Sequence, residues 1–114
     1  DYFPTSPLDM ILENRERGLH TLVLLDIQAH NERYMTAPEG CDIILKMAEK
    51  SGISSIGPDA MVVGIARAGR EDQKVIYASL GEIKEMDLGG PPHCLIIPGK
   101  LHFMEEEVLE LFSN

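Results

Sequence analysis

The spacing of apolar residues changes several times along the chain, from helical to extended and back. After the capping signal Ser6-Pro7, apolar positions recur every three to four residues, which predicts an amphipathic helix that ends at about Arg17. Gly18 follows, where a left-handed closing residue is expected. Residues 20–27 are apolar on both alternations, which predicts a central strand that is covered on both faces.

The middle of the chain repeats this change of spacing. Thr36 and Glu39 form a capping-box pattern before a helical stripe that closes at Ser51-Gly52. Residues 60–66 and 74–78 then predict two buried strands, and the polar turn between them joins the pair as a hairpin.

The last third of the chain predicts a helix, a strand and a final helix. Ser79 and Glu82 repeat the capping pattern, the Gly-Gly-Pro-Pro break ends that short helix, and residues 93–97 predict a strand. The final helix spans residues 103–112 and has one apolar face, formed by Met104, Val108, Leu111 and Phe112. The order of elements predicts an α/β fold, three-layer-like, with a mixed sheet of about four to five strands flanked by helices.

Length and composition indicate one globular domain, residues 1–114. Single cores usually serve ~100–200 residues, and the chain has 114, of which 44% are apolar and 25% charged. Apolar runs such as Leu22 to Leu25 are far too short to span a bilayer, so no membrane partner is expected. Because the chain opens at Asp1 in a linker-like segment, we expect it to be a piece of a longer protein.

The net charge bears on the class of partner, and the cysteines bear on the cellular compartment. Ten Lys and Arg residues face 19 Asp and Glu residues, and a net charge of −9 argues against a nucleic-acid partner. Cys41 and Cys94 stand alone without a C-x-x-C pattern, so no disulfide framework is expected and a reducing, cytoplasmic location fits.

Two patterns that could bind a metal or a phosphate do not meet the requirements for those ligands. The four histidines, at positions 20, 30, 93 and 102, lack the spacing that aims two rings at one ion, so local backbone bonding is favoured and no metal is predicted. Gly64 and Gly69 have P-loop spacing, but Arg70 and Glu71 stand where Lys and Ser or Thr are needed. These small residues indicate close backbone approach, either within the sheet or to a ligand.

Three further positions allow a structural or a functional interpretation. Asp26 ends the first strand and lies either in a solvated loop or at the mouth of a cleft. The stiff Pro91-Pro92 pair precedes His93, which predicts either a rigid turn or a ligand contact through the main chain with the imidazole left free. The acidic run Glu105 to Glu107 suits a helix N-terminus and is expected to face water.

Four motifs, in order and over nearly the whole chain, closely resemble the diphthine synthases in their archaeal form: residues 17–27, 33–36, 63–69 and 90–102. This family belongs to the tetrapyrrole methylase-like methyltransferases, in which two α/β domains hold S-adenosylmethionine in the cleft between them. The resemblance implies that residues 1–114 are the C-terminal domain of such an enzyme, with the N-terminal domain lying outside this chain. The isolated domain is then expected to be inactive.

The resemblance also implies the reaction and the partners. The family methylates the amino group of a modified histidine, 2-(3-amino-3-carboxypropyl)histidine, on translation elongation factor 2 during diphthamide biosynthesis, and a homodimer is expected. Such a transfer needs little acid–base machinery, because the sulfonium is already activated and the enzyme mainly aligns the amine with the methyl group.

Carried over by motif, the family's cofactor contacts fall on Leu25, Ala68 and His93, with the neighbours Leu24, Arg67 and Pro92 as secondary candidates. All lie at predicted strand ends or turns, where ligands of α/β sheets bind. No catalytic residue is identified. Two alternatives remain open: a corrin-precursor methyltransferase of the same fold, and a stand-alone, non-catalytic interaction module.

Overall fold

The structure is a computed structural model that describes residues 7–25, 27–28 and 33–113. Three residues singled out in the sequence, Ser6, Asp26 and His30, lie outside the described residues. No helix in the described ranges is long and apolar enough to cross a membrane.

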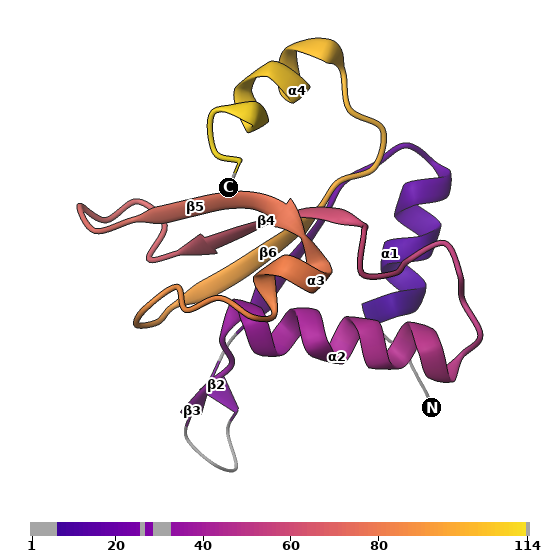
Figure 1. The fold of residues 1–114 in the computed structure, drawn as a ribbon, viewed down its shortest axis with the longest axis horizontal. Helices are drawn as coiled ribbons and strands as arrows, with labels where there is room; N and C mark the ends of the chain where they lie inside the picture. The colour runs from indigo at the N-terminus through magenta and orange to yellow at the C-terminus, as the bar shows by residue number, and fades with distance from the viewer. Residues whose placement is uncertain (1–6, 26, 29–32, 114) are drawn as a thin grey trace.

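Helices and strands follow one another in nearly the predicted order (Figure 1). The chain begins with α1 (Pro7–Glu16), β1 (Thr21–Leu25), β2 (Ile27–Gln28), β3 (Arg33–Tyr34) and α2 (Ala37–Lys50). It continues with β4 (Met61–Ala66), β5 (Lys74–Ser79), α3 (Leu80–Ile83), β6 (His93–Ile97) and α4 (Phe103–Glu110). Among the described elements, the β2–β3 ribbon alone was not predicted, because strands of two residues are too short to show periodicity.

The main sheet has four strands in the order β1-β6-β4-β5, and every neighbouring pair is antiparallel. The α/β class, the number of strands, the β4–β5 hairpin and the flanking helices are confirmed. The prediction of a mixed sheet, with some neighbouring strands parallel, is wrong. Strands β1 and β4 do run the same way, but β6 lies between them and is antiparallel to both, so no parallel neighbours remain.

Strand β1 lies at an edge of the sheet, so the prediction that it is central and covered on both faces is wrong. Its residues Thr21 and Leu25 point inward and are buried. Leu22 and Leu24 point to the opposite face, where they are 59% and 64% exposed. A segment that is apolar on both alternations therefore has only one covered face within the described residues.

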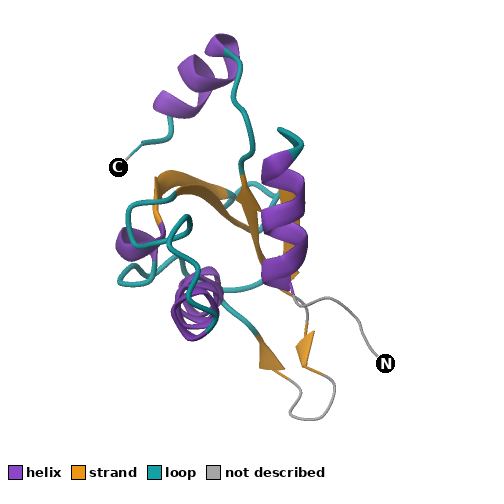
Figure 2. Cartoon of the chain, turned by 90° about the vertical axis from the view of Figure 1, so that its right-hand side faces the viewer, coloured by secondary structure: helices purple, strands orange, loops and turns teal. Residues whose placement is uncertain are grey.

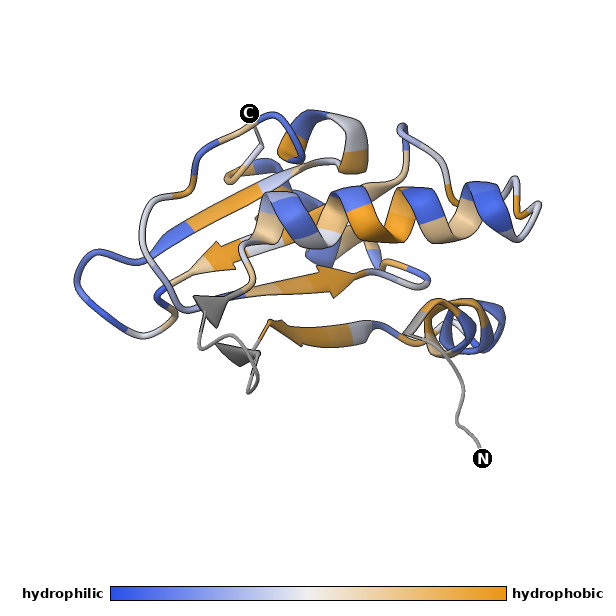
Figure 3. Ribbon diagram, turned by 90° about the horizontal axis from the view of Figure 1, so that it is seen from below, coloured by the Kyte–Doolittle hydropathy of each residue, from blue (hydrophilic) through white to orange (hydrophobic). Residues whose placement is uncertain are grey.

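The core lies between the inner face of the sheet and helices α1, α2 and α3. Figure 3 shows α2 lying along the sheet, with apolar and polar residues alternating along it. Its buried residues include Cys41, Ile44 and Ala48. Buried side chains from both sides meet there, among them Ile11, Ile44, Ile83 and Leu95. A core of this size supplies most of the free energy of folding, at roughly 25 cal/mol per Å² of apolar area buried.

The predicted helix caps are confirmed where the structure describes them. The Thr36 hydroxyl accepts the Glu39 N–H, while the Glu39 carboxylate accepts the Thr36 N–H at 2.9 Å. Ser79 and Glu82 repeat the arrangement at α3, and hydrogen bonds from Ser79 lower the pKa of the Glu82 carboxyl. Gly18, at φ +74°, follows the end of α1 as expected.

Helix α4 lies across the sheet from α2 and contributes no buried residue (Figures 1 and 2). It is held mainly at its two ends. Before the helix, the Gly99 N–H donates to Nδ1 of His20; after it, the Tyr77 N–H donates to the Phe112 carbonyl at 2.8 Å. The apolar face of α4 stays exposed at Met104, Val108, Leu111 and Phe112.

Replacing Gly99 with Ala is expected to destabilise the fold by about 1–3 kcal/mol, because the new methyl group would overlap the backbone of Leu19. Relief of the overlap would separate the two segments and weaken the bond from the Gly99 N–H to His20. Urea unfolding followed by circular dichroism measures the change in the free energy of unfolding. Gly57→Ala is the control, since a methyl group there meets no atom within 4 Å. Equal stability of the two variants would contradict this close approach.

Candidate functional site

The ends of three neighbouring strands lie together on one side of the sheet, on the left in Figure 1. This row of strand ends is called the sheet edge below, and it is distinct from the lateral edge formed by β1. Strands β1 and β4 end there and β6 begins there, so His93 pairs with Leu25 on one side and with Ala66 on the other. Just beyond Ala66, the Arg67 N–H donates to the Pro92 carbonyl at 2.7 Å. The structure thus places Leu25, His93 and the 66–68 segment next to one another.

These residues offer main chain rather than side chains to a ligand. The side chains of Leu25 and His93 point into the core and are only 6% and 4% exposed. Ala68 is exposed and carries only a methyl group, and neither its N–H nor its carbonyl forms a hydrogen bond with a described residue. A cofactor that meets this edge would therefore bind chiefly through backbone groups and apolar contact, as small residues at strand ends permit.

Arg67 fixes the neighbouring loops and is not free to bind a ligand. Its backbone has φ +54°, a left-handed conformation that costs a non-glycine residue about 1–3 kcal/mol. Its guanidinium donates to the carbonyls of Leu88 and Gly90 and forms an ion pair with Asp72 at 2.9 Å. These bonds offset the conformational cost and tie the 67–73 turn to the loop before β6.

The His93 imidazole is fully engaged, so the expectation that it is free is wrong. Nδ1 accepts the Ala37 N–H of α2 at 2.8 Å. Nε2 lies 3.0 Å from the carbonyl oxygens of both Gly89 and Gly90. The sequence pattern does not predict that Ala37, Gly89 and Gly90 bond to His93. The fold alone brings the start of α2 to the loop before β6.

The remaining secondary candidates differ in their placement. Leu24 points away from the core, to the face opposite that of Leu25. Pro92 is exposed, and its carbonyl is already paired with Arg67. The peptide bond between Pro91 and Pro92 is cis.

The described histidines and cysteines show no arrangement for metal or nucleophilic chemistry. No group of three or more His, Cys, Asp or Glu side chains in the described ranges could hold a metal ion. Burial raises the pKa of the Cys41 thiol to about 12 and also raises that of Cys94, so both remain protonated at neutral pH. His20 bonds locally, as expected, to the Gly99 N–H and to Glu105 at 3.1 Å.

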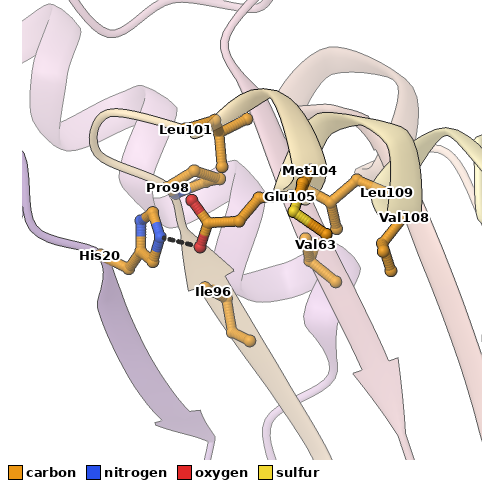
Figure 4. A pocket seen from close by; sticks show the side chains of 9 residues that line it. All are labelled: His20, Val63, Ile96, Pro98, Leu101, Met104, Glu105, Val108 and Leu109. Carbon is orange, nitrogen blue, oxygen red and sulfur yellow. Dashed lines mark hydrogen bonds and ion pairs between the residues drawn. The ribbon is translucent and has the colours of Figure 1, made fainter.

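A separate cavity of about 410 Å³ lies between α4 and the outer face of the sheet (Figure 4). Its walls are almost entirely apolar; the exceptions, His20 and Glu105, form the hydrogen bond that spans one end. The lining is formed by His20, Val63, Ile96, Pro98, Leu101, Met104, Glu105, Val108 and Leu109. None of the carried-over cofactor positions lines this cavity, so it is distinct from the candidate site at the sheet edge.

The chain was compared with models of protein families and with known proteins. No model of a protein family matches the chain. The diphthine synthase of Methanococcus aeolicus is 50% identical over 110 residues, which cover 96% of this chain and 43% of that protein. The diphthine synthase of Methanothermobacter thermautotrophicus is 48% identical over 109 residues, which cover 96% of this chain and 41% of that protein.

Solved structures agree with the sequence matches. A protein from Entamoeba histolytica assigned as a diphthine synthase superposes with a TM-score of 0.90 at 35% identity, covering 97% of this chain and 45% of that chain. A second crystal structure, of diphthine synthase, gives a TM-score of 0.80 at 33% identity and covers 98% of this chain and 41% of that chain. The chain therefore belongs to the diphthine synthase family in sequence and in fold, and it spans just under half the length of the relatives that it matches.

Proposed function

We propose that this chain is the C-terminal domain of an S-adenosylmethionine-dependent methyltransferase and forms one wall of its cofactor cleft. The complete protein would methylate the amino group of the modified histidine of translation elongation factor 2 in diphthamide biosynthesis. The observation that carries this proposal is the meeting of Leu25, Ala68 and His93 at one sheet edge. The 50% identity to a diphthine synthase supports the choice of reaction.

The residues at this edge fit a cofactor that is held by main-chain contacts. Ala68 presents an N–H and a carbonyl without partners among the described residues, and the methyl side chain leaves room for close approach. A methyl group at Gly69 or Gly90 would meet no atom within 4 Å, so the space beside the edge is open.

The chemistry requires positioning more than acid–base catalysis. When bound, S-adenosylmethionine supplies a methyl group on an activated sulfonium. The residues of this chain would hold the cofactor in place and exclude water, while the ordered loops on either side of Ala68 and His93 keep the edge in one geometry. The two described cysteines are free thiols, which agrees with the cytoplasm as the proposed location.

The proposal is tested by replacing Ala68 with Tyr in the complete protein, because the exposed position tolerates a larger side chain but the ring would fill the space at the edge. We expect the Kd for S-adenosylmethionine to rise at least about tenfold. Methylation of elongation factor 2 that carries the modified histidine, followed by mass spectrometry, should fall in parallel.

Lys50→Tyr is the matched control, since Lys50 is exposed and lies at the far end of α2 from the candidate site. It should leave both the Kd and the methylation unchanged. Unaltered methylation by the Ala68→Tyr protein, or no methylation by the wild-type protein, would overturn the proposed function.

A second expectation is that the 114-residue chain folds alone but does not bind S-adenosylmethionine measurably. Its local caps and its core agree with one fold, so circular dichroism should show a cooperative unfolding transition. One wall of a cleft supplies only part of the contacts, while the entropic cost of immobilising a ligand is several kcal/mol. Addition of the separately expressed N-terminal domain should restore binding in calorimetry. Micromolar binding by the chain alone would contradict a site divided between two domains.

We also propose that the complete protein is a homodimer and that the outer sheet face contributes to the interface. Leu22 pairs with Ile96, and Ile96 lines the cavity under α4, so these residues share one face. Leu24 and the apolar side of α4 extend it. Exposed apolar surface of this kind marks interaction sites, and a second copy of the same chain would cover it in a closed pair.

Sedimentation of the complete protein at micromolar concentration should then give the mass of a dimer. Leu22→Glu places a charge on the proposed interface and should shift the mass toward that of a monomer. Ile43→Glu changes an exposed residue of α2 on the opposite side of the sheet and should leave the dimer intact. A wild-type monomer would exclude the homodimer, and an intact Leu22→Glu dimer would place the interface elsewhere.

A further inference from the structure

The hydrogen bonds of His93 define its tautomer. Since the Ala37 N–H can only donate, Nδ1 must accept and carries no proton. Since the carbonyls of Gly89 and Gly90 can only accept, Nε2 carries the proton and donates to both at 3.0 Å. The imidazole is thus neutral, 4% exposed, and has no nitrogen left for a ligand.

The two ring nitrogens of His93 bond to two different segments, the start of α2 and the loop before β6. Ala37 is the first residue of α2, and its N–H is one of the donors that a helix leaves unpaired at its start. The opposite nitrogen holds the loop that leads into β6. Arg67 holds the same loop from the other side, because its guanidinium also donates to the Gly90 carbonyl.

We propose that the His93 imidazole is a positioning residue that fixes the Gly89–Pro92 loop against α2, so that the main chain at this edge, and not the ring, meets the cofactor. This inference rests on the proposed function, because it assumes that the edge binds S-adenosylmethionine. The Nε2 donor is the part of the ring that orders the loop, whereas the Nδ1 acceptor only closes the end of α2.

Two substitutions in the complete protein separate these roles. His93→Asn keeps an acceptor near the place of Nδ1 and loses the donor to the loop. His93→Gln can place an amide N–H near Nε2 and loses the acceptor for Ala37. Each variant loses one of the two hydrogen bonds of the ring. Each therefore serves as the control for the loss of stability that the other variant also suffers.

We expect the Kd for S-adenosylmethionine, measured by calorimetry, to rise about tenfold in His93→Asn and less than about threefold in His93→Gln. In wild-type protein, ¹⁵N NMR of the His93 ring should show protonated Nε2 and unprotonated Nδ1. Saturation with S-adenosylmethionine should leave both ring signals in place while backbone amides of the edge shift.

Equal loss of affinity in the two variants, or a shift of the ring nitrogens on saturation that matches a direct contact, would overturn the positioning role while leaving the proposed function intact. Absence of binding by the wild-type protein would instead overturn the proposed function, and this inference with it.

Discussion

Helix α2 packs closely on the sheet at position 40, which has no side chain. A methyl group on Gly40 would approach Cδ1 of Leu95 to 3.1 Å and Cδ2 of Leu25 to 3.3 Å, so these two leucines pack directly against the helix backbone. This contact sets the height of the first turn of α2 above the sheet edge. The 2.8 Å bond from the Ala37 N–H to His93 depends on that height. Packing in the core therefore determines the geometry of the candidate site.

The two faces of the sheet are covered very differently. The inner face packs against three helices and contains the closely packed core. The outer face carries α4, which touches the sheet around an apolar cavity and leaves Leu22 and Leu24 exposed. A closely packed interior has few voids of this size, so the outer face is packed less completely than the inner face.

The candidate site explains why the side chains alone indicate no reaction type. Leu25 and His93 direct their side chains into the core, and Ala68 has only a methyl group. Arg67 and His93, the polar side chains of this edge, are used to hold loops. What remains accessible is backbone in fixed geometry. Preorganisation of this kind reduces the ordering cost of binding, and it suits a transfer in which alignment is the main requirement.

Sequence alone determined the local elements and the family. The Thr36–Glu39 and Ser79–Glu82 caps, the strands and the α4 stripe all follow from interactions between residues a few positions apart, so periodicity and capping chemistry predict them. The positions carried over by motif also lie together in the structure.

Only the tertiary structure decided the order of the strands, the exposed edge position of β1 and the partners of His93. The Ala37 donor lies 56 residues from His93 in the chain, and β6 is inserted between strands that precede it by many residues. Such contacts depend on how separate elements pack, so no local sequence pattern predicts them. A run of apolar residues predicts a strand, but the packing of the whole chain decides which faces of that strand are covered.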